Sequence, residues 1–185
     1  MEKQTNDTDT EIIIRLAEPA DAADVDAIYR KIHTAEEQGL MTTCWQRDIY
    51  PVYQTALTAA ENKELYIMEK QGTILGAAIF NHRQVDVYAG APWQYDAPED
   101  QVLVMHTLAI DPDAKRQGLG TRFEQFYESL ARKMGCPYLR IDTNARNLTA
   151  RTFYQKLGFR EISIVPCLFN GLSGFELVLL EKALL

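Results

Sequence analysis

The chain has 185 residues, of which 46% are hydrophobic and 24% charged, and its formal net charge at pH 7 is −7. This apolar content excludes general disorder, and only 3 cysteines exclude a disulfide scaffold. The acidic balance argues against a nucleic-acid partner, since phosphate backbones select basic surfaces, and no apolar run approaches the ~20 residues of a membrane span.

The N-terminal stretch, residues 1–10, is polar and acidic and contains no apolar signal-peptide core. We expect a flexible tail there and a cytoplasmic setting. Residues 11–185 show no linker, repeat or low-complexity tract, which predicts a single domain.

Apolar patterning in the first half of the chain predicts short elements. We expect a strand at residues 12–16, a helix from about 21 to 33, and a second helix over about 45–60 that bends at Pro51. Apolar runs at 65–68 and 74–80 flank Gln71-Gly72-Thr73, which indicates an antiparallel hairpin. Residues 84–100 then predict a long ordered loop or irregular hairpin, and loops of that length are usually functional.

The second half alternates strands and helices. We expect strands at 102–110, 138–143, 162–165 and 175–180, with helices at about 118–134 and 147–157 between them. The strand–helix–strand unit over 102–143 predicts a parallel pair with a right-handed crossover. Alternation along 102–110 predicts that His106, Leu108 and Ile110 share one face.

A turn between strand 102–110 and its helix carries the first functional signal. Gly118 and Gly120 let backbone amides point into one concavity, and the positive end of the helix adds to their attraction for an anion. The P-loop and dinucleotide fingerprints both fail here, because Thr121-Arg122 and Phe123 occupy their diagnostic positions. The residues alone leave two interpretations, a phosphate site or a turn in which the glycines only make the bend.

Two motifs resolve this choice through a family resemblance. Lys115-Arg116-Gln117-Gly118-Leu119-Gly120-Thr121 resembles the Gln/Arg-x-x-Gly-x-Gly/Ala loop of the GNAT acetyltransferase superfamily, with Lys115 where Gln or Arg is usual. Residues 147–159 resemble the later Asn-x-x-Ala-x-x-x-Tyr-x-x-x-Gly-Phe motif, and residues 106–112 resemble the strand that enters the loop. The likeness covers roughly residues 12–181 and is weaker before Val102.

The resemblance implies a mixed α/β fold. A single GNAT-like domain would contain a central, mostly antiparallel twisted sheet of about six to seven strands, flanked by about four helices. Its parallel pair, 102–110 and 138–143, would splay apart. The pantetheine arm of a coenzyme can then satisfy the backbone groups that the splay leaves unpaired.

The resemblance also implies acetyl-CoA as co-substrate and no metal. Its expected binding residues are Leu108, Ala109, Ile110, Lys115, Arg116, Gln117, Gly118, Leu119, Gly120, Thr121, Asn147 and Tyr154. Asn147 can equally be a helix cap. Tyr154 matches the family's proposed general acid, and a hydrogen bond to the leaving sulfur is more plausible than full protonation because a phenol pKa of about 10 exceeds that of a thiol. From helical spacing alone, Tyr154 would be a core residue.

His106 is the first candidate for the general base, because a pKa near 6.5 suits that role at neutral pH. The alternatives are a structural histidine, with Asp142, Glu18 or a chain of waters as base. His33 and His82 have no motif context and are expected at the surface. A cysteine nucleophile at Cys136 or Cys167 is disfavoured, since no histidine is near either in the sequence.

The expected activity is N-acetyl transfer to a primary amine of a small molecule by direct attack in a ternary complex. The acceptor pocket is expected to use aromatic and acidic residues suited to a cationic amine, namely Trp45, Tyr50, Tyr53, Tyr88, Trp93, Tyr95 and Phe169 with Asp86, Asp96, Glu99 and Asp100. The alternatives are a protein or peptide N-acetyltransferase and a non-catalytic acyl-CoA-binding regulatory module. The family resemblance also allows a homodimer, although no stretch of the sequence marks an interface.

Overall fold

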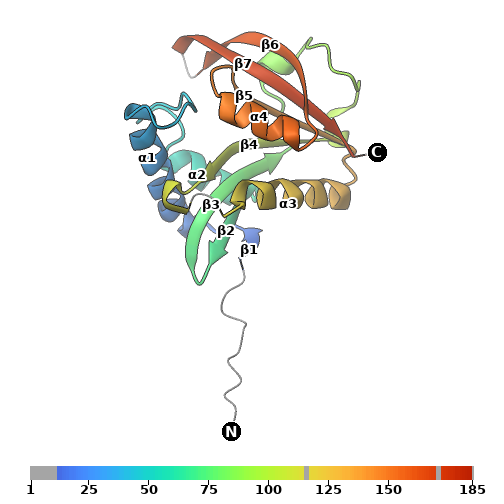
Figure 1. Cartoon of the computed structure of the whole chain (residues 1–185). Coiled ribbons are helices and arrows are strands. Elements are labelled where there is room, and N and C mark those ends of the chain that lie inside the picture. Colours follow the sequence, from blue (N-terminus) through green and yellow to red (C-terminus); the bar gives the residue numbers. More distant parts are fainter. Residues whose placement is uncertain (1–11, 115–116, 170–171, 185) are drawn as a thin grey trace.

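The computed structural model describes residues 12–114, 117–169 and 172–184, and within them a 7-stranded sheet has the order β1-β2-β3-β4-β5-β7-β6 (Figure 1). Every neighbouring pair of these described strands is antiparallel except β4 and β5. The strands are β1 Ile13–Leu16, β2 Leu65–Lys70, β3 Thr73–Asn81, β4 Val102–Ile110, β5 Tyr138–Asn144, β6 Arg160–Phe169 and β7 Leu172–Ala183. The mixed, mostly antiparallel sheet with a parallel pair confirms the predicted fold class.

Helices cover both faces of this sheet in the described part of the chain. They are α1 Ala22–Glu37, α2 Tyr53–Glu61, α3 Leu119–Met134 and α4 Leu148–Lys156. Buried residues of α1 and α2, such as Ile28 and Ala56, share one cluster with Ile67 and Ala77 of the sheet. The opposite face packs Phe123, Tyr127 and Tyr154 of α3 and α4 against Phe80 and Leu139.

The hairpin of β2 and β3 forms as predicted. Gln71 and Gly72 have φ values of 51° and 74°, and a tight hairpin turn of this kind needs positive φ at both central residues. The two C-terminal strands are longer than the predicted 162–165 and 175–180, because β6 and β7 extend their pairing in both directions.

The predicted helix over residues 45–60 is wrong in its first half. The structure has a non-helical segment from Leu40 to Val52, which we call the α1–α2 connection, and α2 begins only at Tyr53. The Glu36 carboxylate accepts hydrogen bonds from the backbone N–H of Thr43 at 2.7 Å and of Cys44 at 3.1 Å. These N–H groups are therefore tied to α1 instead of to a helix of their own. The helix α1 also continues past the predicted end at His33 to Glu37.

The strand β4 contains a bulge that changes which face its residues occupy. Ile79 pairs with His106 and Ala77 with Ala109, so two residues of β4 oppose one of β3, and Thr107 takes a φ of 52°. The expectation that His106, Leu108 and Ile110 share one face is wrong for this reason. Leu108 and Ile110 do share the α3 side, whereas His106 pairs with Ile79, which belongs to the cluster of α1 and α2.

The two parallel strands diverge halfway along their length. Their pairing runs from Val102 with Tyr138 to Met105 with Ile141 and continues no further in the described residues. Beyond that point β4 extends to Ile110 and β5 to Asn144 without a shared ladder. This is the splay that the family resemblance implies.

The segment 84–101 is an ordered loop pinned by a buried ion pair. It contains two short 3-10 helices, η3 Asp86–Tyr88 and η4 Glu99–Gln101. Arg140 of β5 pairs with Glu181 of β7 at 3.1 Å and donates to the Tyr95 carbonyl at 2.8 Å. The Arg140 guanidinium also lies 4.0 Å from the centre of the Trp93 ring. The loop is thus a fixed wall over one end of the sheet.

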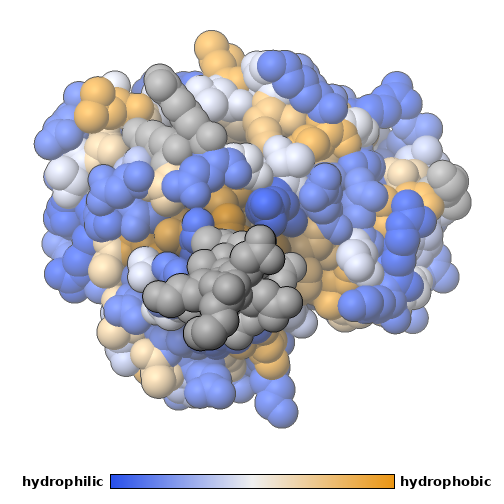
Figure 2. Space-filling model, turned by 60° about the horizontal axis from the view of Figure 1, so that its bottom comes forward, coloured by the Kyte–Doolittle hydropathy of each residue, from blue (hydrophilic) through white to orange (hydrophobic). Residues whose placement is uncertain are grey.

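None of the helices in the described chain is long and apolar enough to cross a bilayer. Hydrophilic and hydrophobic side chains are interspersed on the face shown in Figure 2. The expected flexible tail, residues 1–10, lies outside the described residues.

Candidate active site

A cavity of about 450 Å³ opens where β4 and β5 diverge. Residues 105–108 of β4 and 142–144 of β5 form its floor, and α4 contributes Tyr154. The other walls come from the α1–α2 connection, from η3 and from the β6–β7 hairpin. The splay and the cavity therefore coincide, as a site between two strands requires.

Tyr154 reaches this cavity from the helix α4. The side chain is 7% exposed, its ring packs edge-on against Phe159, and none of the described residues hydrogen-bonds its hydroxyl. Burial and the nearby Asp142 charge raise the pKa of Tyr154 above its ordinary value. Tyr154 is thus a core residue that also lines the cavity.

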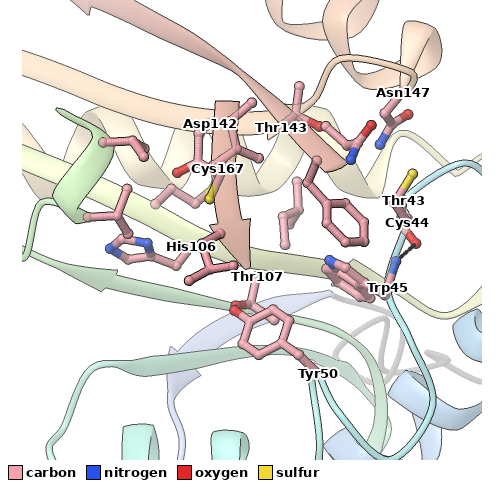
Figure 3. A pocket seen from close by; sticks show the side chains of 18 of the residues that line it. Thr43, Cys44, Trp45, Tyr50, His106, Thr107, Asp142, Thr143, Asn147 and Cys167 are labelled. Atoms are coloured by element: carbon pink, nitrogen blue, oxygen red, sulfur yellow. Dashed lines mark hydrogen bonds between the residues drawn. The ribbon is translucent and has the colours of Figure 1, made fainter. Parts of the chain in front are cut away.

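Asp142 faces the cavity from β5, at the first position past the parallel ladder (Figure 3). Its Oδ2 accepts a hydrogen bond from the Tyr88 hydroxyl at 2.9 Å, and it forms no ion pair with a described cation. Burial raises the pKa of the Asp142 carboxyl. A half-buried carboxylate of this kind is a stronger base than an exposed one.

His106 also lines the cavity, from the last position of β4 before the bulge. Its Nε2 lies 3.0 Å from Asn81 Oδ1 and 3.1 Å from the Arg83 carbonyl oxygen. Both partners accept hydrogen bonds, so Nε2 carries the hydrogen and Nδ1 keeps its lone pair. Burial lowers the pKa of His106 to about 4, which makes the ring a weaker base than its ordinary value suggests.

The third alternative base, Glu18, stands apart from the site. It is exposed at the start of the 3-10 helix Pro19–Asp21 and does not line the cavity. Among the cysteines, Cys44 and Cys167 line the cavity and Cys136 is buried elsewhere. Burial raises the thiol pKa of Cys44 and Cys167, which keeps them as weak nucleophiles.

The glycine turn before α3 has the conformation that its sequence predicts. Gly118 caps the helix with a φ of 69°, and a Cβ placed on it would meet nothing within 4 Å. No side chain in the described part of the chain caps this end, so no described side chain satisfies the first-turn N–H groups of α3. Leu119 is buried and anchors the turn, while Gln117 and Thr121 are exposed.

The remaining predicted binding residues divide between the cavity and its surroundings. Asn147 caps α4, since its Oδ1 accepts from the Ala150 N–H at 3.2 Å, and it also lines the cavity. Leu108 lines the cavity, Ala109 is buried against α1 and α2, and Ile110 packs on the α3 side. Gly120 lies close to Phe153, with 3.1 Å between a Cβ built there and the ring. The predicted residues Lys115 and Arg116 lie outside the described residues.

Only part of the expected aromatic set lines the cavity. Trp45 and Tyr50 do, on the α1–α2 connection, and the Tyr50 hydroxyl is hydrogen-bonded to Thr107 at the bulge. In contrast, Tyr88, Trp93 and Tyr95 do not line it, because they build the loop 84–101 and pack on one another or on Tyr138. Tyr53 is exposed, and Asp96, Glu99 and Asp100 also lie off the cavity.

The expectation that His33 lies at the surface is wrong. This histidine is 3% exposed, and its Nε2 lies 3.1 Å from the Tyr50 carbonyl oxygen. Like Glu36, it ties the α1–α2 connection to α1. His82 is half-buried, with Nδ1 2.8 Å from the Val102 carbonyl oxygen.

Several cavity residues carry no motif that would identify them. Thr43, Cys44 and Thr143 line the cavity through long-range folding alone. The position of Asp142 had a weak signal, because it directly follows the apolar part of a predicted strand.

Comparisons with known proteins connect this geometry to a family. A model described as the acetyltransferase (GNAT) family matches residues 25–159. Among curated proteins, the chain is 35% identical over 72 residues to the ribosomal protein bS18-alanine N-acetyltransferase of Escherichia coli K12. That match covers 39% of this chain and 49% of the relative, so it spans about half of the relative's length.

Solved structures show the same fold over nearly the whole chain. A GNAT-family acetyltransferase from Listeria monocytogenes has a TM-score of 0.71 at 22% identity, covering 95% of this chain and 96% of that one. An acetyltransferase from Salmonella typhimurium, solved with acetyl-CoA, has a TM-score of 0.66 at 19% identity and covers 94% of each chain. The ribosomal-protein-S18-alanine N-acetyltransferase of Escherichia coli has a TM-score of 0.65 at 17% identity and covers 94% of each chain.

Proposed function

The chain belongs to the GNAT acetyltransferase family, and from this premise we propose that it transfers an acetyl group from acetyl-CoA to a primary amine of a small molecule. The transfer proceeds by direct attack of the amine in a ternary complex. The observation that carries this proposal is the cavity between the diverging strands, with the Tyr154 and Asp142 side chains at its wall.

The residues present fit an acyl-CoA donor on two independent grounds. From His106 onward, β4 has a described neighbour on one edge only, so its other edge offers backbone groups to a peptide-like pantetheine arm around Leu108–Ile110. The first turn of α3 offers free N–H groups behind Gly118, which suit a diphosphate. When bound, the donor supplies the thioester whose acetyl group is transferred.

Asp142 is the residue best placed to act as the base. Its raised pKa brings the carboxylate closer to the range where a base works efficiently, whereas the lowered pKa of His106 does the opposite. Asp142 accepts a proton from the substrate ammonium, which frees the nitrogen lone pair to attack the thioester carbonyl. The N–C bond forms, the C–S bond breaks and the electron pair of that bond goes to sulfur. The second proton that the nitrogen must lose to become an amide goes to the departing thiolate, which leaves as the free thiol, while Asp142 returns its proton to solvent.

Tyr154 stabilises the departing thiolate. A thiol of pKa ~8.5 leaves without full protonation, and the raised pKa of Tyr154 keeps its hydroxyl protonated at neutral pH. The hydroxyl therefore donates a hydrogen bond to the sulfur and retains its proton. His106 holds Asn81 and the Arg83 carbonyl, which fixes the wall beside the reacting groups.

A peptide acceptor is the second candidate, and one observation favours it. The curated relative from Escherichia coli acts, by its name, on an alanine of ribosomal protein bS18. A cavity walled on one side by the α1–α2 connection and on another by η3 favours a small molecule instead.

A thiol-release assay over small amines, amino acids and peptides with a free N-terminus tests the proposal. We expect acetyl-CoA-dependent thiol release with a small primary amine and none without an acceptor. Stronger turnover with peptides would replace the small-molecule acceptor by a peptide. Binding of acetyl-CoA without turnover over the whole panel would indicate a non-catalytic module.

A further inference from the structure

The acceptor side of the cavity carries negative charge that no lining cation balances. Two carboxylates line it, Asp142 from β5 and Asp86 from η3. None of its lining residues within the described chain is a lysine or an arginine, and His106 is uncharged at neutral pH. A bound ligand therefore meets carboxylates without a guanidinium or ammonium group beside them.

The carboxylate of Asp142 is set among neutral phenols. Its charge acts on the hydroxyls of Tyr50, Tyr88 and Tyr154, and the Tyr88 hydroxyl donates a hydrogen bond to it. A half-buried carboxylate without a cation is unfavourable, and an ammonium group of the substrate supplies the missing charge. A second carboxylate brought to the same place by the substrate would be repelled.

The rest of the cavity wall suits an apolar or aromatic body. Trp45 and Tyr50 come from the α1–α2 connection and meet edge to face, with 6.3 Å between ring centres. In Figure 3 these rings lie across the cavity from Asp142. The remaining apolar lining includes Val85, Val87, Met105, Leu108 and Leu177. An ammonium at Asp142 thus leaves the carbon skeleton of the ligand facing rings and aliphatic groups.

Three described cations act on groups at or beside the cavity without lining it. The charge of Arg83 acts on His106 and that of Arg140 on Tyr88, but Arg83 is paired with Glu64 and Arg140 with Glu181. Arg146, an exposed residue of the turn before α4, is close enough to Cys44 for its charge to act on that thiol. Cys44 lies beside Asn147 in Figure 3, on the other side of the cavity from Asp142 and His106. The charge of Arg146 is not among the influences on the pKa of Asp142, which are burial and the Tyr88 hydroxyl.

We infer that the acceptor is a primary arylalkyl- or alkylamine with no carboxylate next to the reacting nitrogen, so that the enzyme selects against free amino acids. This inference rests on the proposed function and narrows its substrate class. Charge decides the selection, because an amino acid and its decarboxylated amine differ by one carboxylate and share the same side chain.

Matched acceptor pairs test the inference directly. We expect kcat/KM for phenethylamine to exceed that for L-phenylalanine by roughly 100-fold, and isoamylamine to exceed L-leucine similarly, as expected for like-charge repulsion in a shielded site. L-Phenylalaninamide keeps the bulk and removes the charge, so it should recover most of the loss. Equal or better turnover of the amino acids would overturn the inference, as would a peptide with N-terminal alanine that exceeds every small amine.

Variants locate the source of the selection. Asp86→Asn should narrow the preference for phenethylamine several-fold, while Asp96→Asn, an exposed acid of the same loop that does not line the cavity, should leave it unchanged. Arg146→Gln should leave the preference unchanged. If the wild type accepts amino acids and Arg146→Gln removes that activity, Arg146 binds their carboxylate and the inference is wrong.

Binding measurements separate this inference from the proposed transfer. Calorimetry with the CoA-saturated protein should detect phenethylamine and not L-phenylalanine at the same concentration. Selective binding without thiol release would refute the transfer and support the acceptor class. If neither compound binds at millimolar concentration, the cavity is not an amine site and the inference fails.

Discussion

At the scale of single residues, the hydroxyl of Tyr154 is the group whose removal should change chemistry alone. Tyr154→Phe keeps the ring that packs on Phe159 and removes only the donor at the cavity. We expect kcat to fall by roughly 10- to 100-fold, no more than the lower bound for general acid catalysis, because the hydroxyl donates a hydrogen bond without giving up its proton. The donor KM should stay nearly unchanged. Steady-state kinetics measure both, and Tyr66→Phe, outside the cavity, is the control. An unaltered kcat would remove Tyr154 from the reaction.

The ionised carboxylate of Asp142 should lower the stability of the folded protein. Its pKa is raised in the folded state, so the folded protein holds the proton more tightly than the unfolded chain, and the ionised carboxylate costs stability above the folded pKa. Asp142→Asn keeps an oxygen acceptor for Tyr88 and removes this charge. We expect Tm at pH 8 to rise by about 2–4 °C, the effect of about 1 kcal/mol in a chain of this size.

The pH dependence of that gain identifies its cause. The difference in Tm should shrink as the pH falls through the folded pKa of Asp142, and vanish below the ordinary carboxyl value. Thermal melts from pH 4 to 8 follow it, with Asp96→Asn, an exposed acid, as the control. A gain that stays constant over this range would come from packing and not from charge.

The site was predictable at the residue scale wherever a motif is local. Asn147 as a helix cap and Gly118 at the helix start follow from their neighbours in the sequence, and the structure has both. His106 was placed by strict alternation, which the bulge at Thr107 interrupts. A bulge depends on pairing with another strand, so the sequence of β4 alone does not reveal it.

At the scale of elements, a substitution at the N-terminus of α3 should weaken donor binding by more than its backbone strain explains. Gly118→Val places a β-branched side chain at a φ of 69°, which costs about 1–2 kcal/mol, and sets its methyl groups before the first-turn amides. We expect the donor KM to rise by about 10-fold or more, measured by thiol release.

The other end of the same helix supplies a matched control. Gly135 has a φ of 75° and equally open space around a Cβ, so Gly135→Val carries the same backbone cost away from the site. Both variants should lose similar Tm, while only Gly118→Val should change the donor KM. Equal donor KM values for the two would refute anion binding at this turn.

The wrong helix prediction over residues 45–60 shows that local periodicity does not always identify an element. Apolar residues there recur at spacings compatible with a helix, yet contacts of two α1 side chains with the connection prevent one. Glu36 and His33 hold Thr43 and the Tyr50 carbonyl at sequence distances that local periodicity does not sense. The same long-range contacts bring Trp45 to the cavity.

At the scale of the whole molecule, the strand order follows from simple rules and one exception. Hairpins explain the neighbours β2–β3 and β6–β7, and a right-handed crossover explains β4–β5. The strand β7 lies between β5 and β6 through long-range pairing. The sequence therefore predicts that these strands exist but not their order in the sheet. The predicted fold class survives because it depends on element types more than on their order.

The stability of the whole molecule should depend strongly on the buried ion pair Arg140–Glu181. Both side chains are nearly inaccessible, at 4% and 1% exposed, and Glu181 also accepts the Gln94 N–H at 3.0 Å, so β5, β7 and the loop 84–101 meet at this pair. Arg140→Met leaves the Glu181 carboxylate buried without its cation. We expect the free energy of unfolding, measured with urea, to fall by about 3–5 kcal/mol.

An exposed ion pair serves as the control for the stability loss expected of Arg140→Met. Arg30 and Asp26 form an ion pair along α1 with Arg30 70% exposed, and Arg30→Met should cost less than about 0.5 kcal/mol. The double variant Arg140→Met with Glu181→Leu should lose less than the sum of its single changes, since it leaves no unpaired charge. If Arg140→Met lowered the free energy of unfolding no more than Arg30→Met does, that result would mean that apolar contacts hold the loop 84–101 in place and that the buried pair does not.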